Sequence, residues 1–286
     1  MEIINKTSDL RRAVKKIKKA NDIIAFVPTM GALHDGHLKL VKEAKKEADI
    51  VLVSIFVNPT QFGANEDLDK YPRDLKGDSK KLENLAVDII FYPEINEIYP
   101  KHYQTTVSLS KITKGLCGDK RLGHFDGVAT IVLKLFNIVT PDIAFFGLKD
   151  YQQFRVISQM IKDLNLNIKI HGVDIVREPD GLAMSSRNLN LTPKGRKKAP
   201  LINKILTECI KNYKKNEENF KDSKFVINFA KKHLEQNGFT IDYIEIRDRV
   251  NLLEMETIND DSMIFIATFI DNVRLIDNYS FGVKYE

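Results

Sequence analysis

Short apolar runs alternate with amphipathic segments through the first 176 residues. Consecutive apolar residues predict buried strands, and apolar residues that recur every three or four positions predict helices. The expected strands are 23–28, 50–57, 87–92, 143–146 and 168–176, and the expected helices are 36–48, 76–85, 127–139 and 151–164. Strands that are apolar throughout are covered on both faces. The pattern therefore predicts an α/β fold, a Rossmann-like parallel sheet with helices on both faces.

The pattern changes near Arg177. A turn signal, Glu178-Pro179-Asp180-Gly181, is followed by helical periodicity over 193–213 and 223–236. Three strand-like runs then follow at 240–246, 263–269 and 273–279. Helices followed by strands predict a small α+β domain. We expect one domain at residues 1–176 and a C-terminal domain at residues 177–286.

Charge and hydrophobicity exclude some classes of partner. The formal net charge is +5, but acidic and basic residues are interleaved, which is typical of solvated helix faces rather than of a nucleic-acid surface. The small excess of base suits anionic small substrates. No apolar run approaches the roughly 18 residues of a membrane span. We expect neither nucleic acid nor a membrane as a partner.

The cysteines indicate the compartment. Cys117 and Cys209 are the only two, and they form no C-x-x-C pair. This spacing predicts neither a zinc site nor a disulfide framework, and it favours a reducing environment. The first residues also contain no apolar stretch of signal-peptide length. We therefore expect a cytoplasmic protein.

The segment 28–37 carries the strongest candidate chemistry. It joins the first long strand to the first predicted helix and contains His34, Gly36 and His37. A helix N-terminus offers unpaired N–H groups and a positive dipole end, which suit phosphate. Imidazoles there can stabilise charge on a departing pyrophosphate. The placement predicts a nucleotidyl-transfer site, and the alternative is a pair of surface histidines in a glycine turn.

Neutral polar residues follow the next strand. Asn58 and Gln61 can hydrogen-bond a carboxylate or hydroxyl without adding charge, or they can satisfy loop backbone. The acidic run 65–74 could contact magnesium, although such runs are more often polar loops.

Two later segments have the composition of phosphate sites. Gly147 permits close approach of a ligand to the backbone, and Lys149 can reach a phosphate. Asp150 can take part in catalysis, but a role as cap of the helix that contains Gln153 is at least as consistent with its position. The segment 184–188 offers two hydroxyls and a guanidinium, an anion clamp, with a helix-capping serine loop as the alternative. His124, between two glycines, fits a site or a helix start equally. The segments after Val27, Val57, Phe146 and Val176 all lie at the carboxyl ends of predicted strands, where parallel sheets bind ligands.

Taken in order, these segments resemble the pantoate–β-alanine ligase family over nearly the whole chain. The stretches that carry the resemblance are 28–37 (PTMGALHDGH), 56–62 (FVNPTQF), 71–74 (YPRD), 123–128 (GHFDGV), 147–153 (GLKDYQQ) and 177–188 (REPDGLAMSSRN). Beyond about Arg196 the chain carries little of it.

The resemblance implies a HIGH-type nucleotidyl-transferase domain and a C-terminal lid domain. It implies that ATP and pantoate form pantoyl adenylate and pyrophosphate, and that β-alanine then displaces AMP to form pantothenate. Mg²⁺ accompanies ATP, without assigned protein ligands, and the enzyme is usually a homodimer. The catalytic positions by this comparison are His34, His37, Lys149, Ser185, Ser186 and Arg187. Those for ATP are Met30, Gly31, Ala32, Leu33, His34, Asp35, Gly36, His37, Gly147, Leu148, Lys149, Asp150, Val176, Met184, Ser185, Ser186 and Arg187. Those for the substrates are Gln61, Gln153 and Asn58.

Two positions depart from the family pattern, and two rival functions stay open. Leu148 stands where a charged residue is usual, and Leu122 where proline is common. One rival is another HIGH-type nucleotidylyltransferase. Such an enzyme would need cationic residues around its phosphate acceptor, whereas Gln61 and Gln153 are neutral. The other is a catalytically silent nucleotide- or RNA-binding module, which would not need all the strand-end segments.

Overall fold

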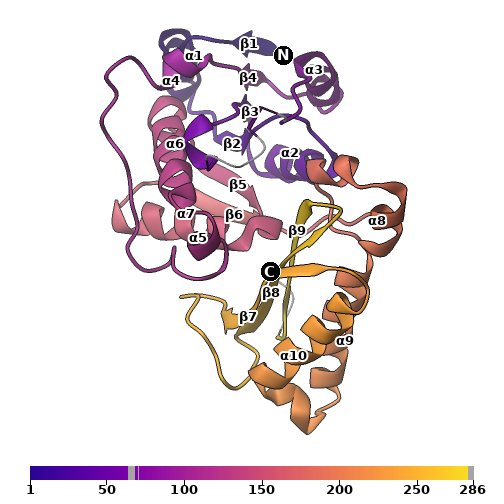
Figure 1. Ribbon diagram of the computed structural model, residues 1–286. Helices are drawn as coiled ribbons and strands as arrows, with labels where there is room; N and C mark the ends of the chain where they lie inside the picture. Colours follow the sequence, from indigo (N-terminus) through magenta and orange to yellow (C-terminus); the bar gives the residue numbers. More distant parts are fainter. Residues whose placement is uncertain (64–67, 70, 283–286) are drawn as a thin grey trace. The chain divides into compact units, whose positions relative to one another are not determined.

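The computed structural model of the chain describes residues 1–63, 68–69 and 71–282 (Figure 1). They form two compact units. The first comprises Met1–Thr113, Arg121–Leu148 and Val156–Val173, and the second comprises Lys114–Lys120, Lys149–Arg155 and the chain from Asp174 onward. None of the helices in these described ranges is both long and apolar enough to cross a bilayer.

The first unit is built on a six-stranded parallel sheet of order β1-β4-β3-β2-β5-β6. Its strands are β1 (Glu2–Ile4), β2 (Ile24–Thr29), β3 (Ile50–Ile55), β4 (Ile89–Phe91), β5 (Ile143–Gly147) and β6 (Lys169–Val173). The chain runs outward from β2 to β3 and β4, and then returns to place β5 on the other side of β2. The carboxyl ends of β2 and β5 thus form the switch point at which open α/β sheets bind ligands. The predicted parallel sheet is confirmed.

Helices cover both faces of this sheet (Figure 1). Their bounds are α1 (Thr7–Lys19), α2 (Asp35–Glu47), α3 (Leu75–Glu83), α4 (Ile95–Ile98), α6 (His124–Val139) and α7 (Tyr151–Asp163). Phe26 of β2 meets Phe136 of α6 with ring centroids 6.3 Å apart. Its neighbour Val27 belongs to a cluster with Leu40 of α2 and Leu82 of α3. Because successive strand residues point to opposite faces, cover on both sides accounts for the unbroken apolar run.

Some boundaries differ from the predictions. The hydrophobic pattern did not predict β1, α1, α4 or α5 (Leu116–Lys120); in α1 only Leu10 and Val14 are buried, so its apolar stripe is narrow. The helix expected from residue 127 begins at His124, after Gly123 in the left-handed region (φ 76°). The strand expected to reach residue 176 ends at Val173, because Val176 instead accepts a hydrogen bond from Met184 N (2.9 Å).

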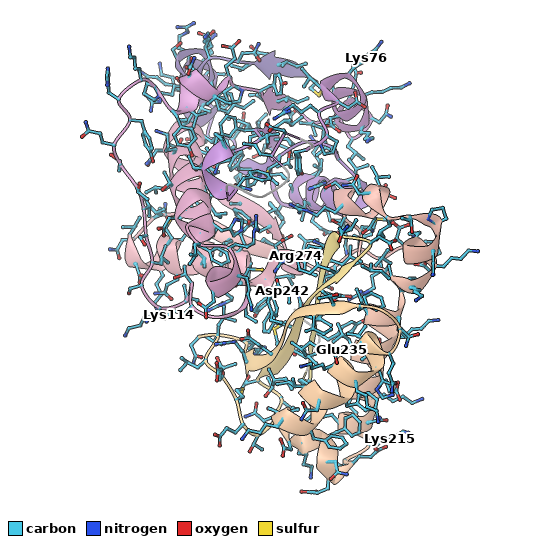
Figure 2. All side chains as sticks on the ribbon, viewed as in Figure 1. Lys76, Lys114, Lys215, Glu235, Asp242 and Arg274 are labelled. Carbon is cyan, nitrogen blue, oxygen red and sulfur yellow. The ribbon has the colours of Figure 1, made fainter. Side chains whose placement is uncertain are left out.

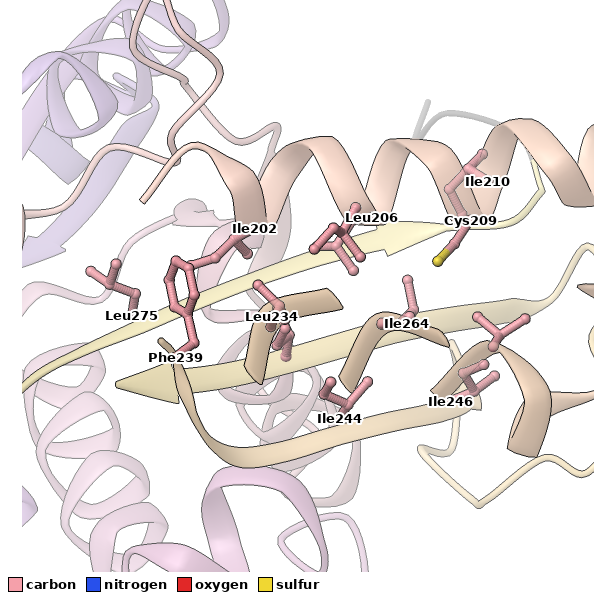
Figure 3. Close-up of a cluster of buried hydrophobic side chains, with 14 of the residues drawn as sticks. Ile202, Leu206, Cys209, Ile210, Leu234, Phe239, Ile244, Ile246, Ile264 and Leu275 are labelled. Carbon is pink, nitrogen blue, oxygen red and sulfur yellow. The ribbon is translucent and has the colours of Figure 1, made fainter. Parts of the chain in front are cut away.

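The second unit contains an antiparallel sheet, β7 (Thr240–Asp248), β8 (Ser262–Ile270) and β9 (Val273–Ser280). Helices α9 (Leu201–Lys214) and α10 (Ser223–Glu235) contribute Leu206 and Leu234 to its core, with Ile264 from the sheet (Figure 3). The predicted α+β architecture is confirmed. The single helix expected over 193–213 is wrong, because α8 (Pro193–Lys198) ends before Pro200, which has no N–H to continue the ladder. The domain boundary at Val176 stays a prediction.

A carboxylate from a distant helix holds the turn between β2 and α2. Asp78 of α3 is 1% exposed, and its Oδ2 and Oδ1 accept from the backbone N–H groups of Ala32 and Leu33, both at 2.8 Å. Lys81 Nζ donates to the Leu33 carbonyl at 2.6 Å. Ala32 has φ 51°, a left-handed conformation that costs an L-residue about 1–2 kcal/mol. The hydrogen bonds from α3 thus stabilise a backbone that the local sequence disfavours.

We expect Asp78→Asn to lower the free energy of unfolding of the first unit by about 1–3 kcal/mol, because one buried backbone donor would face an amide NH₂. Urea unfolding followed by circular dichroism measures the change. Glu83→Gln is the matched control, since Glu83 is exposed on the same helix and its substitution is expected to change the value by less than about 0.5 kcal/mol. Identical midpoints for the two variants would contradict the assigned role of Asp78.

Candidate active site

The two histidines of segment 28–37 form a reciprocal cap on α2. His34 is the N-cap residue, and its Nδ1 accepts from the Gly36 backbone N–H (3.2 Å). His37 Nδ1 accepts from the His34 backbone N–H (3.4 Å), and the two rings lie 4.1 Å apart. A Cβ at Gly36 would lie 2.8 Å from His34 Cε1 and 2.9 Å from its Nδ1. The glycine is therefore required by the ring of His34 itself.

This cap selects the tautomer of both rings. An Nδ1 atom that accepts a backbone N–H carries no proton in the neutral imidazole, so the proton lies on Nε2. In the neutral state His34 and His37 thus each carry their proton on Nε2, beside the positive end of α2. Asp35, the first residue of α2, follows His34 directly. A pair of donors at a helix N-terminus is suited to phosphate oxygens.

A buried hydrogen-bond chain orients Gln61, which lies in a short 3₁₀ turn, η1 (Pro59–Gln61), after β3. Gln61 Oε1 accepts from Asn58 Nδ2 (3.2 Å), and Gln61 Nε2 contacts Met30 Sδ (2.9 Å). Asn58, 1% exposed, also donates Nδ2 to the Gly127 carbonyl (3.1 Å) and accepts at Oδ1 from Tyr99 (2.8 Å). The Gln61 amide is therefore fixed with its NH₂ group toward Met30.

The start of α6 supports the backbone of this turn. His124, 8% exposed, places Nδ1 2.8 Å from the Gln61 carbonyl and Nε2 2.9 Å from Arg121 Nη1. A Cβ at Gly127 would overlap the carbonyl of Thr60, so α6 can pack this closely only with glycine there. The sequence left two interpretations of His124 open, a binding-site residue or the first residue of a helix. The structure places it at the helix start, in contact with Gln61.

A pocket of 260 Å³ opens beside the turn in the first unit. Met30, Gly31 and Asp78 line it, together with residues after β3 and β4. Residues 65–67 and 70 of the acidic run considered for magnesium lie outside the described residues. Within the described ranges, no group of three or more His, Cys, Asp or Glu is arranged to hold a metal ion.

The segment after β5 places its chemistry at the start of α7. A Cβ at Gly147 would meet nothing within 4 Å, so open space surrounds it. Leu148 is 2% exposed, a buried position that suits its apolar side chain. Lys149, with 20% of its side chain exposed, lies 3.8 Å from the Asp150 carboxylate. Gln153 is half-buried in the first turn of α7.

Gln152 differs from its neighbour Gln153. Both ends of the Gln152 amide are used within the second unit, with Nε2 donating to the Gly115 carbonyl and Oε1 accepting from Cys117 N. This glutamine therefore holds the segment that contains α5.

The segment 184–188 follows a hairpin. Val176 and Met184 pair through the backbone, and Arg177 bridges to Ala183. Ser185 Oγ accepts from the Arg187 N–H (3.3 Å) as the N-cap of a 3₁₀ turn, η3 (Ser186–Asn190). Ser185 thus caps the 3₁₀ turn, as in the alternative of a helix-capping serine loop that the sequence left open. Ser186 and Arg187 are half-buried.

Sequence reasoning missed two residues that organise these groups, Asp78 and Tyr99. Asp78 reaches the β2–α2 turn from 46 positions along the chain, and Tyr99 reaches Asn58 from 41 positions. Neither lies in a segment that carries the family resemblance. Both partners become neighbours only through folding, so no local signal could have found them.

Comparisons with known proteins agree with this fold. The family described as pantoate-beta-alanine ligase matches residues 2–280. Pantothenate synthetase of Thermosipho africanus is 48% identical, with 97% of this chain and 99% of that protein covered. That of Aquifex aeolicus is 49% identical, with 97% of this chain and 98% of that protein covered.

Solved structures give the same result. Pantothenate synthetase from Thermus thermophilus has a TM-score of 0.93 at 38% identity, covering 99% of this chain and 100% of that one. Pantoate-beta-alanine ligase from Francisella tularensis, complexed with beta-gamma ATP and beta-alanine, has a TM-score of 0.82 at 37% identity, covering 98% of each chain. The resemblance predicted from the sequence is confirmed. The chain belongs to the pantoate–β-alanine ligase family, enzymes that join pantoate to β-alanine.

Proposed function

We propose that this ligase works through a pantoyl-adenylate intermediate. A carboxylate oxygen of pantoate attacks the α-phosphorus of ATP, and the bond from that phosphorus to the departing pyrophosphate breaks. The amine of β-alanine then attacks the acyl carbon, the bond to AMP breaks, and the amine loses a proton as the amide forms. The observation that carries the proposal is the reciprocal cap that fixes both histidine rings at the start of α2.

The histidines contribute to the first step by stabilising charge. Negative charge grows on the pyrophosphate oxygens as the α-phosphorus bond breaks, and fixed donors lower the energy of that state. Because the cap holds both rings before ATP arrives, little reorganisation is needed during the reaction. We propose that Mg²⁺ enters with the phosphates of ATP.

We propose that backbone groups and later segments of the chain make the remaining contacts with ATP. We propose that Met30 to His37 and Gly147 to Asp150 bind ATP, together with Val176 and Met184 to Arg187. Lys149 and Arg187 supply positive charge, and the open space at Gly147 leaves room for a ligand close to the backbone.

We propose that Gln61 and Gln153 select pantoate. The hydrogen bond from Asn58 to Gln61 Oε1 leaves the NH₂ end as the donor that a carboxylate or hydroxyl can use. A neutral amide binds such groups without the cationic cluster that a phosphate acceptor would need. Asn58, whose own hydrogen-bonding atoms have protein partners, contributes by orienting Gln61.

Three broader features complete the proposal. We propose that residues 177–286 act as a lid domain that shields the water-sensitive adenylate. We also propose that the enzyme is a cytoplasmic homodimer, and the two free cysteines, Cys117 and Cys209, suit a reducing compartment. Sedimentation analysis of the purified protein tests the dimer.

The overall reaction is tested by product analysis. We expect continuous release of AMP and pyrophosphate only when ATP, pantoate and β-alanine are all present. Without β-alanine, pyrophosphate release is expected to stop after about one turnover per site, because the adenylate stays bound. Pyrophosphate release with a phosphate-bearing acceptor, and without AMP, would instead identify a nucleotidylyltransferase.

We expect His37→Ala to slow adenylate formation by about 10²–10³-fold, because one donor to the developing charge is lost. Attack of β-alanine on preformed adenylate should change much less. Rapid-quench measurement of the two half-reactions separates these effects. His233→Ala, on α10 of the second unit, is the control and should leave both rates near those of the unchanged protein. An equal loss in both half-reactions for His37→Ala would reject the assigned role.

We expect Tyr99→Phe to raise the apparent KM for pantoate about 2–10-fold while the KM for ATP stays unchanged. The variant removes the hydroxyl that donates to Asn58 Oδ1, a bond worth about 0.5–1.5 kcal/mol, so the amide that orients Gln61 is held less firmly. Tyr103→Phe is the matched control, because Tyr103 packs edge-to-face against Tyr99 with ring centroids 4.9 Å apart. A larger effect on ATP than on pantoate would contradict this hydrogen-bond chain.

A further inference from the structure

The two faces of the C-terminal sheet have different partners within the second unit. Alternate residues such as Ile244, Ile266 and Leu275 pack with α9 and α10 in the apolar core. The opposite face carries polar side chains from β7 and β9. Arg274 of β9 pairs with Asp242 at 2.8 Å (Figure 2). This second face therefore adds polar contacts to the buried apolar residues, such as Phe265, that β8 places on it.

This polar face holds the start of α7. Asn278 of β9 is 4% exposed, and its Nδ2 donates to the backbone carbonyl of Lys149 at 3.0 Å. Tyr151, two residues on, donates its hydroxyl to the Arg249 carbonyl (2.9 Å) and packs its ring 5.7 Å from that of Phe265. Lys149 is thus attached to the C-terminal sheet through its own backbone.

The preceding residue of β9 holds the other nucleotide segment. Asp277, 4% exposed, accepts from Arg177 Nη1 and Nη2 at 2.7 and 2.9 Å. Arg177 also donates to the Gly181 carbonyl (3.2 Å) and lies 4.7 Å from the ring centre of Tyr279. Burial lowers the pKa of Arg177, but the hydrogen bonds and charge of Asp277 outweigh burial and raise it above its ordinary value. This ion pair anchors the hairpin that leads into residues 184–187.

We propose that Asp277 and Asn278 are positioning residues that set both nucleotide-binding segments in one frame. Adjacent residues of a strand lie about 3.3 Å apart along its axis, so anchors on such neighbours allow little relative movement. Asn278 acts through Lys149, and Asp277 acts through Arg177 on residues 184–187. Displacing a charged group by about 1 Å can cost roughly 10²-fold in rate, which makes this attachment important for adenylation. The inference rests on the proposed role of Lys149 in binding ATP.

The experiment compares Asn278→Ala, Lys149→Ala and the double variant. We expect Asn278→Ala to lower the rate of adenylate formation about tenfold, with attack of β-alanine on preformed adenylate unchanged. Lys149→Ala should cost more, and the double variant should be no slower than Lys149→Ala, because Asn278 acts through the lysine. Asn278→Leu, which keeps about the same size but cannot donate, should behave as Asn278→Ala does.

A destabilised variant separates positioning from general stability. Leu206→Ala removes a fully buried side chain of α9 that belongs to the apolar core on the other face. It should lower the thermal midpoint while leaving adenylation unchanged below that midpoint. Multiplied losses in the double variant, or a similar slowing by Leu206→Ala, would overturn the positioning role. Full activity of Lys149→Ala would overturn the proposed ATP contact and this inference with it, whereas full activity of Asn278→Ala alone would overturn only the inference.

Discussion

The two hydrogen bonds between the buried Asp78 carboxylate and the backbone of Ala32 and Leu33 are the interaction on which the active-site geometry depends. A buried carboxylate without partners costs several kcal/mol, so the turn and α3 hold each other in place. This turn brings the chain to His34 in the extended conformation of an N-cap. The reciprocal cap with His37 then follows from the register of α2, and it determines which ring nitrogens carry protons.

The same principle operates at Gln61. A free amide can turn either end to a ligand, but here the oxygen end accepts from Asn58, and the oxygen of Asn58 accepts from Tyr99. Because each amide in the chain has a committed donor and acceptor, its orientation is settled before a substrate binds. The selection of pantoate that we propose for Gln61 depends on this preorganisation, since an amide free to rotate would accommodate donors and acceptors alike.

Within the second unit, side-chain hydrogen bonds likewise hold the segments that we propose to bind the nucleotide. One face of its three-stranded sheet is apolar beneath α9 and α10, and the other combines buried apolar residues of β8 with polar side chains such as Arg274 and Asn278. The division also explains how α7 can begin in one unit and end in the other. Its first turn is in the second unit, where Tyr151 donates a hydrogen bond to the Arg249 carbonyl. Its residues from Val156 onward are in the first unit.

Local patterns were sufficient to predict the strands other than β1, the helix after β2, the histidine turn and the family, because periodicity, capping and motif spacing act over a few residues. The break at Pro200 is also a local feature, but the apolar periodicity on both sides of it predicted one continuous helix. The partners of the motif residues were decided only by the tertiary structure. Asp78, Tyr99 and Asn278 reach Ala32, Asn58 and Lys149 across 46, 41 and 129 positions. A hydrogen bond across such a distance leaves no periodic trace in the sequence, because the path of the folded chain alone brings its donor and acceptor together.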